Sequence, residues 1–177
     1  DKLEVECLEL GRLQNSLKNG QLDLVLSSAG NYRRFLLEGY GLRDLATMVS
    51  NQAPNPNYAE GSVFFVRSDR NDLDSIGALK NKSVSANYPF AFSGWQIAAG
   101  ELLNRDFDRD HFFSKVDFLG HGASPVIEAV LSGKTDAGIV RACVLENAGL
   151  LKSGLVKVLD PKETTDFPCA VSTRLYP

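Results

Sequence analysis

The chain has 177 residues, of which 44% are hydrophobic and 23% are charged, and its formal net charge at pH 7 is −3. This length and composition are typical of a globular protein with a buried core, arranged as one compact domain or as two small lobes. No stretch combines clustered Lys and Arg with aromatic residues, which argues against a nucleic-acid partner. No run approaches the about 18 apolar residues that a membrane-spanning helix needs.

The cysteine and histidine residues do not predict a metal site. Three cysteines and two histidines are present, without metal-ligand spacing. The odd number of cysteines allows one disulfide and one thiol, or three thiols. A disulfide between Cys143 and Cys169 is one of these alternatives, and it depends on an oxidising compartment rather than on spacing. No cofactor is predicted.

Strand-like and helix-like patterns alternate along the chain before residue 60. Apolar residues alternate with acidic ones at residues 3–7, and the apolar run at 22–26 is typical of a strand covered on both faces. In chain order we predict a strand over 3–7, a helix that carries Leu10, Leu13 and Leu17 and ends at Asn19-Gly20, a strand over 22–26, a helix capped by Asn31 and running through Leu37, a strand over 45–49, and a loop over 51–57.

The remainder of the chain continues the alternation. Ser124 followed by Pro125 is a strong helix start, because proline fits the first helical position. In chain order we predict a strand over 62–67, a helical turn through Leu79, a strand at Ser83–Ala86, a helix over Ile97 to Leu102, a strand over 116–119, a helix over 124–131 that stops at Gly133, a strand over 137–140, a helix over about 144–151, a strand over 155–159 and an extended piece over 168–173.

The stretch from Ser83 to Leu103 predicts a strand, a loop and a helix that together bind an anion. Ser93 stands at the expected N-cap, so its hydroxyl and the backbone N–H groups of Gly94, Trp95 and Gln96 would face the loop. The N-terminal end of a helix dipole favours negative charge. An ordinary capped helix is the alternative, but the loop is long and carries Tyr88, Phe90, Phe92 and Trp95.

Two further positions are candidates from residue type alone. Ser28 lies in a small, polar segment at the carboxyl end of a predicted strand, where ligands lie in open α/β sheets. Arg141 is the best cation for an oxyanion, because its planar fork of donors matches one. The alternative for Arg141 is a surface salt bridge to Glu146 or Asp136.

An internal echo favours two similar α/β lobes. A helix, Gly20, two residues and Asp23 precede the apolar run at 22–26, and the same spacing places Gly133 and Asp136 before the strand over 137–140. Each unit is followed by a small polar loop and another helix. Two such lobes facing one another would form a cleft that suits a small ligand.

Several segments support a resemblance to known families. One set of segments resembles the phosphonate-type periplasmic substrate-binding proteins of ABC transporters: Ser62 to Asp69, Leu79 to Val84, Phe92 to Gln96, Phe118 to His121 and Val126 to Ala137. A second set looks like the sensor domains of tetrathionate-type histidine kinases, which carry the same fold: Gly138 to Glu146, Cys169, and Ser172 to Pro177. Together they cover nearly the whole chain.

The resemblance implies an α/β, two-lobed architecture of the type II periplasmic-binding-protein kind, with mixed sheets flanked by helices and a ligand cleft between the lobes. Residues 1–61 plus 142–177 would form lobe 1, and residues 62–141 would form lobe 2. A first strand and helix of lobe 1 would precede Asp1, and a membrane segment and kinase would lie outside this chain. Tyr32, Ser93 and His121 fall on ligand-contacting positions of the family, although the serine of the family's Gly-Ser-His turn is replaced here.

Three functions from different classes follow. The first is the extracytoplasmic, periplasmic sensor domain of a membrane histidine kinase, which binds a small anion and signals by lobe closure. The second is the substrate-binding protein of an ABC transporter for a phosphonate or related oxyanion, and the third is an enzyme. No set of nucleophile, base and orienting residue supports the enzyme. A homodimer stays open. The predicted ligand-binding residues are Ser28, Asn31, Tyr32, Tyr88, Ser93, Gly94, Trp95, His121 and Arg141.

Overall fold

The computed structural model describes residues 2–49, 59–164 and 167–176. The chain divides into two compact units, Asp1–Ala46 and Thr47–Pro177. None of the described helices is both long enough and apolar enough to cross a bilayer. The predicted loop over 51–57 lies outside the described residues.

The first unit contains two helices, α1 (Leu10–Lys18) and α2 (Ala29–Leu37). Both were predicted, but the N-cap of α2 is Ser28 and not Asn31. The Ser28 hydroxyl oxygen accepts a hydrogen bond from the backbone N–H of Asn31, which therefore lies inside the first turn. Only Phe35 of this unit is a buried hydrophobic residue among those described, and its ring packs edge-on against Tyr40.

The predicted strands over 3–7, 22–26 and 45–49 are wrong, because no strand is assigned to these residues. A strand is completed by hydrogen bonds to a neighbouring strand, and the described residues before Ala59 contain no other strand to supply them. Large apolar side chains consequently remain exposed, among them Leu3, Val5, Leu24, Leu26 and Leu45.

The second unit is built on one mixed, five-stranded sheet with the order β3-β2-β4-β1-β5. Its strands are β1 (Ser62–Arg67), β2 (Ser83–Ala86), β3 (Lys115–Phe118), β4 (Ala137–Arg141) and β5 (Val156–Val158). Strand β2 pairs in parallel with β3 and β4, whereas β1 runs antiparallel to β4 and β5. The predicted extended piece over 168–173 forms only an isolated bridge from Val171 to Lys162.

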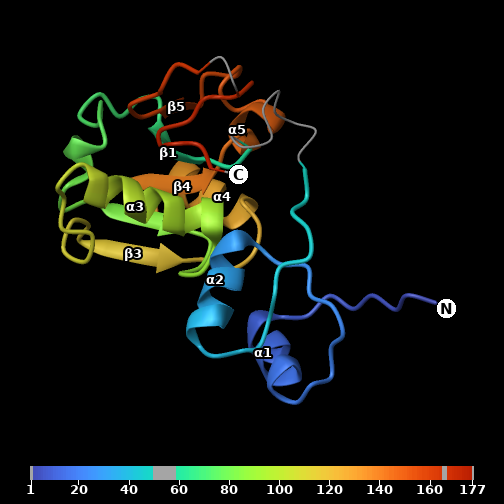
Figure 1. Cartoon of the computed structure of the whole chain (residues 1–177). Helices are drawn as coiled ribbons and strands as arrows, with labels where there is room; N and C mark the ends of the chain where they lie inside the picture. The colour runs from blue at the N-terminus through green and yellow to red at the C-terminus, as the bar shows by residue number, and fades with distance from the viewer. Residues whose placement is uncertain (1, 50–58, 165–166, 177) are drawn as a thin grey trace. The chain divides into compact units, whose positions relative to one another are not determined.

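The helices cover both faces of this sheet (Figure 1). They are the short η2 (Gly77–Leu79), η3 (Phe92–Gln96), α3 (Ile97–Asn104), α4 (Ser124–Leu131) and α5 (Val144–Asn147), the last shorter than the predicted 144–151. The connection from β2 through α3 leads to one neighbour of β2, and the connection from β3 through α4 crosses to the other. Because such connections are right-handed, α3 and α4 lie on opposite faces.

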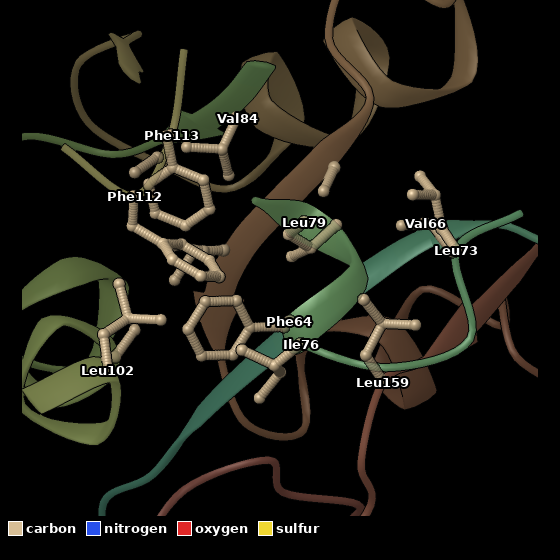
Figure 2. Packing of buried hydrophobic residues seen from close by; sticks show 14 residues of the cluster. Phe64, Val66, Leu73, Ile76, Leu79, Val84, Leu102, Phe112, Phe113 and Leu159 are labelled. Carbon is tan, nitrogen blue, oxygen red and sulfur yellow. The ribbon is translucent and has the colours of Figure 1, made fainter. Parts of the chain in front are cut away.

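Side chains of β1 alternate between the two faces and form two separate cores. Phe64 and Val66 join the core on the α3 side, where Figure 2 shows Phe64 lying between Leu102 and Ile76. Val63 and Phe65 point to the other side and pack with Val126 of α4. This is why the apolar run over 62–67 carries no polar alternation: both faces are covered.

Two further findings concern side chains singled out in the sequence. Cys143 and Cys169 are joined by a disulfide with an S–S distance of 2.04 Å, and Cys7 is an exposed thiol. Phe64, Phe65, Phe112 and Phe113 are buried, whereas Phe118 is 39% exposed. The lobe boundaries at 61/62 and 141/142 stay a prediction.

Candidate functional site

The candidate site lies at one edge of the five-stranded sheet. The parallel strands β2, β3 and β4 all end at this edge, and the antiparallel β1 begins there, with Ser62 paired to Arg141. The loops that follow β2 and β3 lead to helices on opposite faces. In open α/β sheets ligands bind at the carboxyl ends of the strands where this reversal occurs.

The loops after β2 and β3 are joined through Asn87. Its side-chain amide donates to the backbone carbonyl oxygens of Gly120 and Gly122, the residues on either side of His121. The rings of Tyr88 and His121 lie in contact, with centroids 4.7 Å apart. These two predicted site residues therefore belong to one surface, on adjacent strand ends.

The helix after this loop begins differently from the prediction. The backbone N–H of Gln96 donates to the carbonyl oxygen of Ala91 over 2.9 Å, which forms a single wide turn, η3, ahead of α3. Trp95 donates to the same carbonyl oxygen. The N–H groups of Trp95 and Gln96 are thus used within the helix, and those of Phe92, Ser93 and Gly94 are at its first turn.

Ser93 is not the N-cap that the sequence predicted, because the helix already begins at Phe92 after Ala91. Its hydroxyl donates instead to the Glu60 carboxylate, with an Oγ to Oε2 distance of 2.6 Å. The other oxygen of the same carboxylate receives the Arg141 guanidinium, with an Nη2 to Oε1 distance of 2.7 Å. Two predicted anion-binding groups therefore converge on one carboxylate of the chain itself.

Neighbouring segments fix the positions of these three side chains. The Ser62 hydroxyl, which is fully buried, donates to the backbone carbonyl oxygen of Ser93 over 2.6 Å. Glu60 pairs with Tyr176 through both backbone groups, each at 2.8 Å. The cluster of Glu60, Ser93 and Arg141 is therefore supported from β1, from the start of the helix and from the C-terminal segment.

Arg141 has neither of the partners that the sequence suggested as alternatives to a ligand. Asp136 is bound by Arg70, at an oxygen to nitrogen distance of 2.8 Å, and Glu146 accepts the backbone N–H of Ala170. The Arg141 side chain remains 46% exposed at the edge of the sheet. Its guanidinium thus faces solvent as well as Glu60.

Trp95 lies apart from the cluster. Its ring packs edge-on against Phe118 with centroids 5.2 Å apart and also contacts Phe113, beside the core on the α3 side. Trp95 is a predicted ligand-binding residue, and in the structure its ring packs among aromatic side chains beside this core. The residues Ser28, Asn31 and Tyr32 share the start of α2 in the first unit, where the Tyr32 hydroxyl donates to Asp44.

Three residues of this edge were not singled out from the sequence: Glu60, Ser62 and Asn87. A glutamate before a buried strand and a serine at its start are ordinary in composition, so nothing local marks them. Asn87 directly follows a strand and precedes Tyr88, and a polar residue at the end of a strand could have been named as a site candidate from the sequence. Within the described residues, no group of His, Cys, Asp or Glu side chains is arranged to hold a metal ion.

A scan against protein families matches residues 9–175 to a family described as the ABC transporter, phosphonate, periplasmic substrate-binding protein. The chain belongs to this family. Family members bind ligands and are typically not enzymes. A search of curated proteins gave no significant match.

Solved structures agree with this membership at the level of the fold. XAC2383 from Xanthomonas citri, solved bound to chloride ion, is 19% identical with a TM-score of 0.60, and the match covers 91% of this chain and 59% of that one. A binding-protein component of an ABC phosphonate transporter from Pseudomonas aeruginosa is 17% identical with a TM-score of 0.50, over 67% of this chain and 40% of that one.

A third similar structure is the GluR0 ligand-binding core from Nostoc punctiforme in complex with L-glutamate. It is 18% identical with a TM-score of 0.50, and the match covers 97% of this chain and 67% of that one. Likeness at this identity shows a shared α/β periplasmic-binding-protein fold. The chain spans less than two thirds of the length of the first two proteins.

Proposed function

We propose that the chain is the ligand-binding region of a substrate-binding protein that captures a phosphonate or a related small oxyanion for an ABC transporter. The observation that supports this most is the convergence of the Ser93 hydroxyl and the Arg141 guanidinium on a single carboxylate at the edge of the sheet. The Ser93 hydroxyl and the Arg141 guanidinium already bind the two oxygens of one carboxylate, so their donors have the spacing that an oxyanion needs.

The remaining candidate residues have consistent roles in this proposal. Tyr88 and His121 would contact the ligand from the loops after β2 and β3, and Gly94 would contribute its backbone N–H at the first turn of the helix. Ser28, Asn31 and Tyr32, at the start of α2 in the first unit, stay predicted ligand-binding residues. Ligand binding would then shift an equilibrium between open and closed lobes towards the closed form.

The compartment is part of the proposal. The Cys143 to Cys169 disulfide is typical of proteins in oxidising environments such as the bacterial periplasm. The family is described as periplasmic. We therefore place the ligand-binding region outside the cytoplasm.

Thermal unfolding in the presence of anions tests the function. A panel should contain methylphosphonate, phosphate, methanesulfonate, tetrathionate and a small carboxylate. A ligand at a hundredfold excess over its dissociation constant stabilises the folded state by about 2.7 kcal/mol. We expect at least one anion of the panel to raise the melting temperature, with phosphonate or phosphate giving the largest rise.

The variants Arg141→Ala and Ser93→Ala should abolish or strongly reduce this rise. Arg109→Ala is a matched control, because Arg109 is an exposed arginine that pairs with Asp110 before β3 begins, away from the strand ends of the site. Arg109→Ala should retain the full rise. If no anion shifts the melting temperature, or if both site variants respond like Arg109→Ala, the proposed site is wrong.

A sensor domain of a membrane histidine kinase is the second candidate. It rests on the C-terminal segments, Gly138 to Glu146 and Ser172 to Pro177, which resemble tetrathionate-type sensors. The full coding sequence separates the two candidates. A transmembrane helix followed by a kinase in the same reading frame would favour the sensor, and transporter genes alongside a short coding sequence would favour the transport role.

A further inference from the structure

The donors that the proposed function assigns to an oxyanion are already engaged by Glu60. A serine hydroxyl has one proton, and Ser93 gives it to Glu60 Oε2 at 2.6 Å. The hydroxyl oxygen therefore has only lone pairs for any other group. An anion needs a hydrogen-bond donor, so Ser93 can donate to an anion only after the Glu60 carboxylate has moved away from the hydroxyl.

The same carboxylate also neutralises the positive charge of the site. Glu60 Oε1 lies 2.7 Å from Arg141 Nη2, and the ionised pair has no net charge. Arg141 retains other N–H donors, since a guanidinium has five and the described pair engages Nη2. An incoming anion nevertheless meets a guanidinium whose charge is balanced from within the chain.

The surroundings keep Glu60 at this position but do not seal it. Its backbone is fixed by two hydrogen bonds to Tyr176, and adjacent Gly61 packs closely on the C-terminal segment, where an added Cβ would lie 3.0 Å from Val171 Cγ1. The Glu60 and Arg141 side chains are 25% and 46% exposed. A carboxylate on a fixed backbone with its side chain partly in solvent can change rotamer without moving β1.

We propose that Glu60 competes with anionic ligands for Ser93 and Arg141, and thereby sets the ligand charge that this cluster accepts. The inference rests on the proposed anion-binding function and deepens it. Glu60 weakens the binding of multiply charged oxyanions, because such a ligand must displace the Glu60 carboxylate and is repelled by its negative charge. Removing the charge of Glu60 weakens its contacts to the donors of Ser93 and Arg141, so that a ligand displaces it more easily.

The decisive variant is Glu60→Gln, which keeps the size of the side chain and removes its charge. Binding of methylphosphonate, phosphate and methanesulfonate is measured by titration calorimetry for the wild type and the variant. Methylphosphonate has no positively charged amino group that Glu60 could attract, so any effect of Glu60 on its binding comes from the negative charge of the ligand. We expect Glu60→Gln to bind methylphosphonate and phosphate about tenfold more tightly, equivalent to about 1.4 kcal/mol, with a smaller gain for singly charged methanesulfonate.

Two controls separate this competition from a general charge effect. Glu128→Gln removes the same charge from an exposed position on α4 and should leave the affinities unchanged. The double variant Glu60→Gln with Arg141→Gln should bind the anions no more tightly than Arg141→Gln alone, because the Arg141 guanidinium is the source of the gain in affinity. The gain should also shrink at high ionic strength, since salt screens partly exposed charges.

The outcomes are distinct for the inference and for the proposed function. Tighter binding in Glu60→Gln supports the competition, also if the wild type binds too weakly to measure. Wild-type binding with unchanged or weaker binding in Glu60→Gln overturns the inference and leaves the anion-binding function standing. If neither protein binds any of the anions, both are overturned. A melting curve of each variant without ligand verifies that it is folded.

Discussion

Close backbone approaches shape the site at the scale of single residues. Gly94 is buried at the first turn of the helix, where an added Cβ would clash with the side-chain oxygen of Asn87 and lie 3.0 Å from its Cγ. Asn87 in turn holds the loop from Gly120 to Gly122. The missing side chain of Gly94 therefore lets three segments of the site meet.

Gly94→Ala should displace Asn87 and disturb both loops. We expect a destabilisation of about 1 to 3 kcal/mol, as for an overpacked core position, together with weakened anion binding. Urea denaturation and calorimetric titration of the bound anion measure the two effects. Gly100→Ala is the matched control: Gly100 lies in α3 with open space around an added Cβ, so alanine should be neutral or stabilising there. Equal behaviour of the two variants would contradict this role of Gly94.

Ser93 and Arg141 were predicted as anion-binding residues because a hydroxyl near a helix start and a guanidinium at a strand end suit an anion. The structure brings both side chains to Glu60, and their binding of an anion stays a prediction. Their common partner could not be predicted. Glu60 reaches Ser93 only because β1 runs antiparallel to β4 and begins where β2 and β4 end.

At the scale of elements, the prediction from sequence succeeded where strands find partners. The predicted strands that became β1 and β2 each pair with β4, and helices cover the sheet that they form. The equally apolar run over 22–26 has no partner strand among the described residues of its unit. The echo of Gly20 and Gly133 illustrates this: both have the left-handed backbone of a helix end, but only Gly133 leads into a strand.

The start of β4 is tied to the start of β2 by Asp136. Its carboxylate accepts from the backbone N–H and the hydroxyl of Ser83 and from the Arg70 guanidinium. Burial alone would raise the pKa of Asp136, but the hydrogen bonds from Ser83 and the charge and hydrogen bond of Arg70 outweigh it and lower the pKa. The ionised form is therefore favoured by folding.

Asp136→Asn should cost about 2 kcal/mol of unfolding free energy at neutral pH, because hydrogen bonds to a charged group are lost. A lowered pKa in the folded state stabilises the protein above the ordinary carboxyl pKa, and this stabilisation is lost as the pH falls through the folded-state value. The difference between wild type and variant should therefore shrink in acid. Urea denaturation at several pH values measures it, and a difference that does not depend on pH would contradict the assignment.

The disulfide links the end of β4 to the C-terminal segment across 26 residues of sequence. A crosslink of this span restricts the unfolded chain, so Cys143→Ser with Cys169→Ser should lower the unfolding free energy by about 2 to 4 kcal/mol. Cys7→Ser is the control, because Cys7 is an exposed thiol. The wild type in reductant should match the double variant, and equal stability of all these forms would rule out a structural role for the bond.

At the scale of the whole molecule, the two units differ in how much apolar surface they bury. The buried residues of both cores belong to Thr47–Pro177, whereas the described part of Asp1–Ala46 contains Phe35 as its single buried hydrophobic residue. Burial of apolar surface is the main source of stability. Among the described residues, most of the stabilisation from buried apolar surface therefore comes from the sheet that positions the candidate site and from its two cores.

A pair of truncations tests this distribution. Phe64 is fully buried on β1, so Phe64→Ala should remove about 3 to 5 kcal/mol of unfolding free energy through lost burial and the cavity left behind. Leu26 is 86% exposed although it ends an apolar run, so Leu26→Ala should change stability by less than about 0.5 kcal/mol. Urea denaturation of both variants gives the comparison. A large loss for Leu26→Ala would mean that the apolar run over 22–26 is buried against a partner in solution, as the strand pattern of the sequence had predicted.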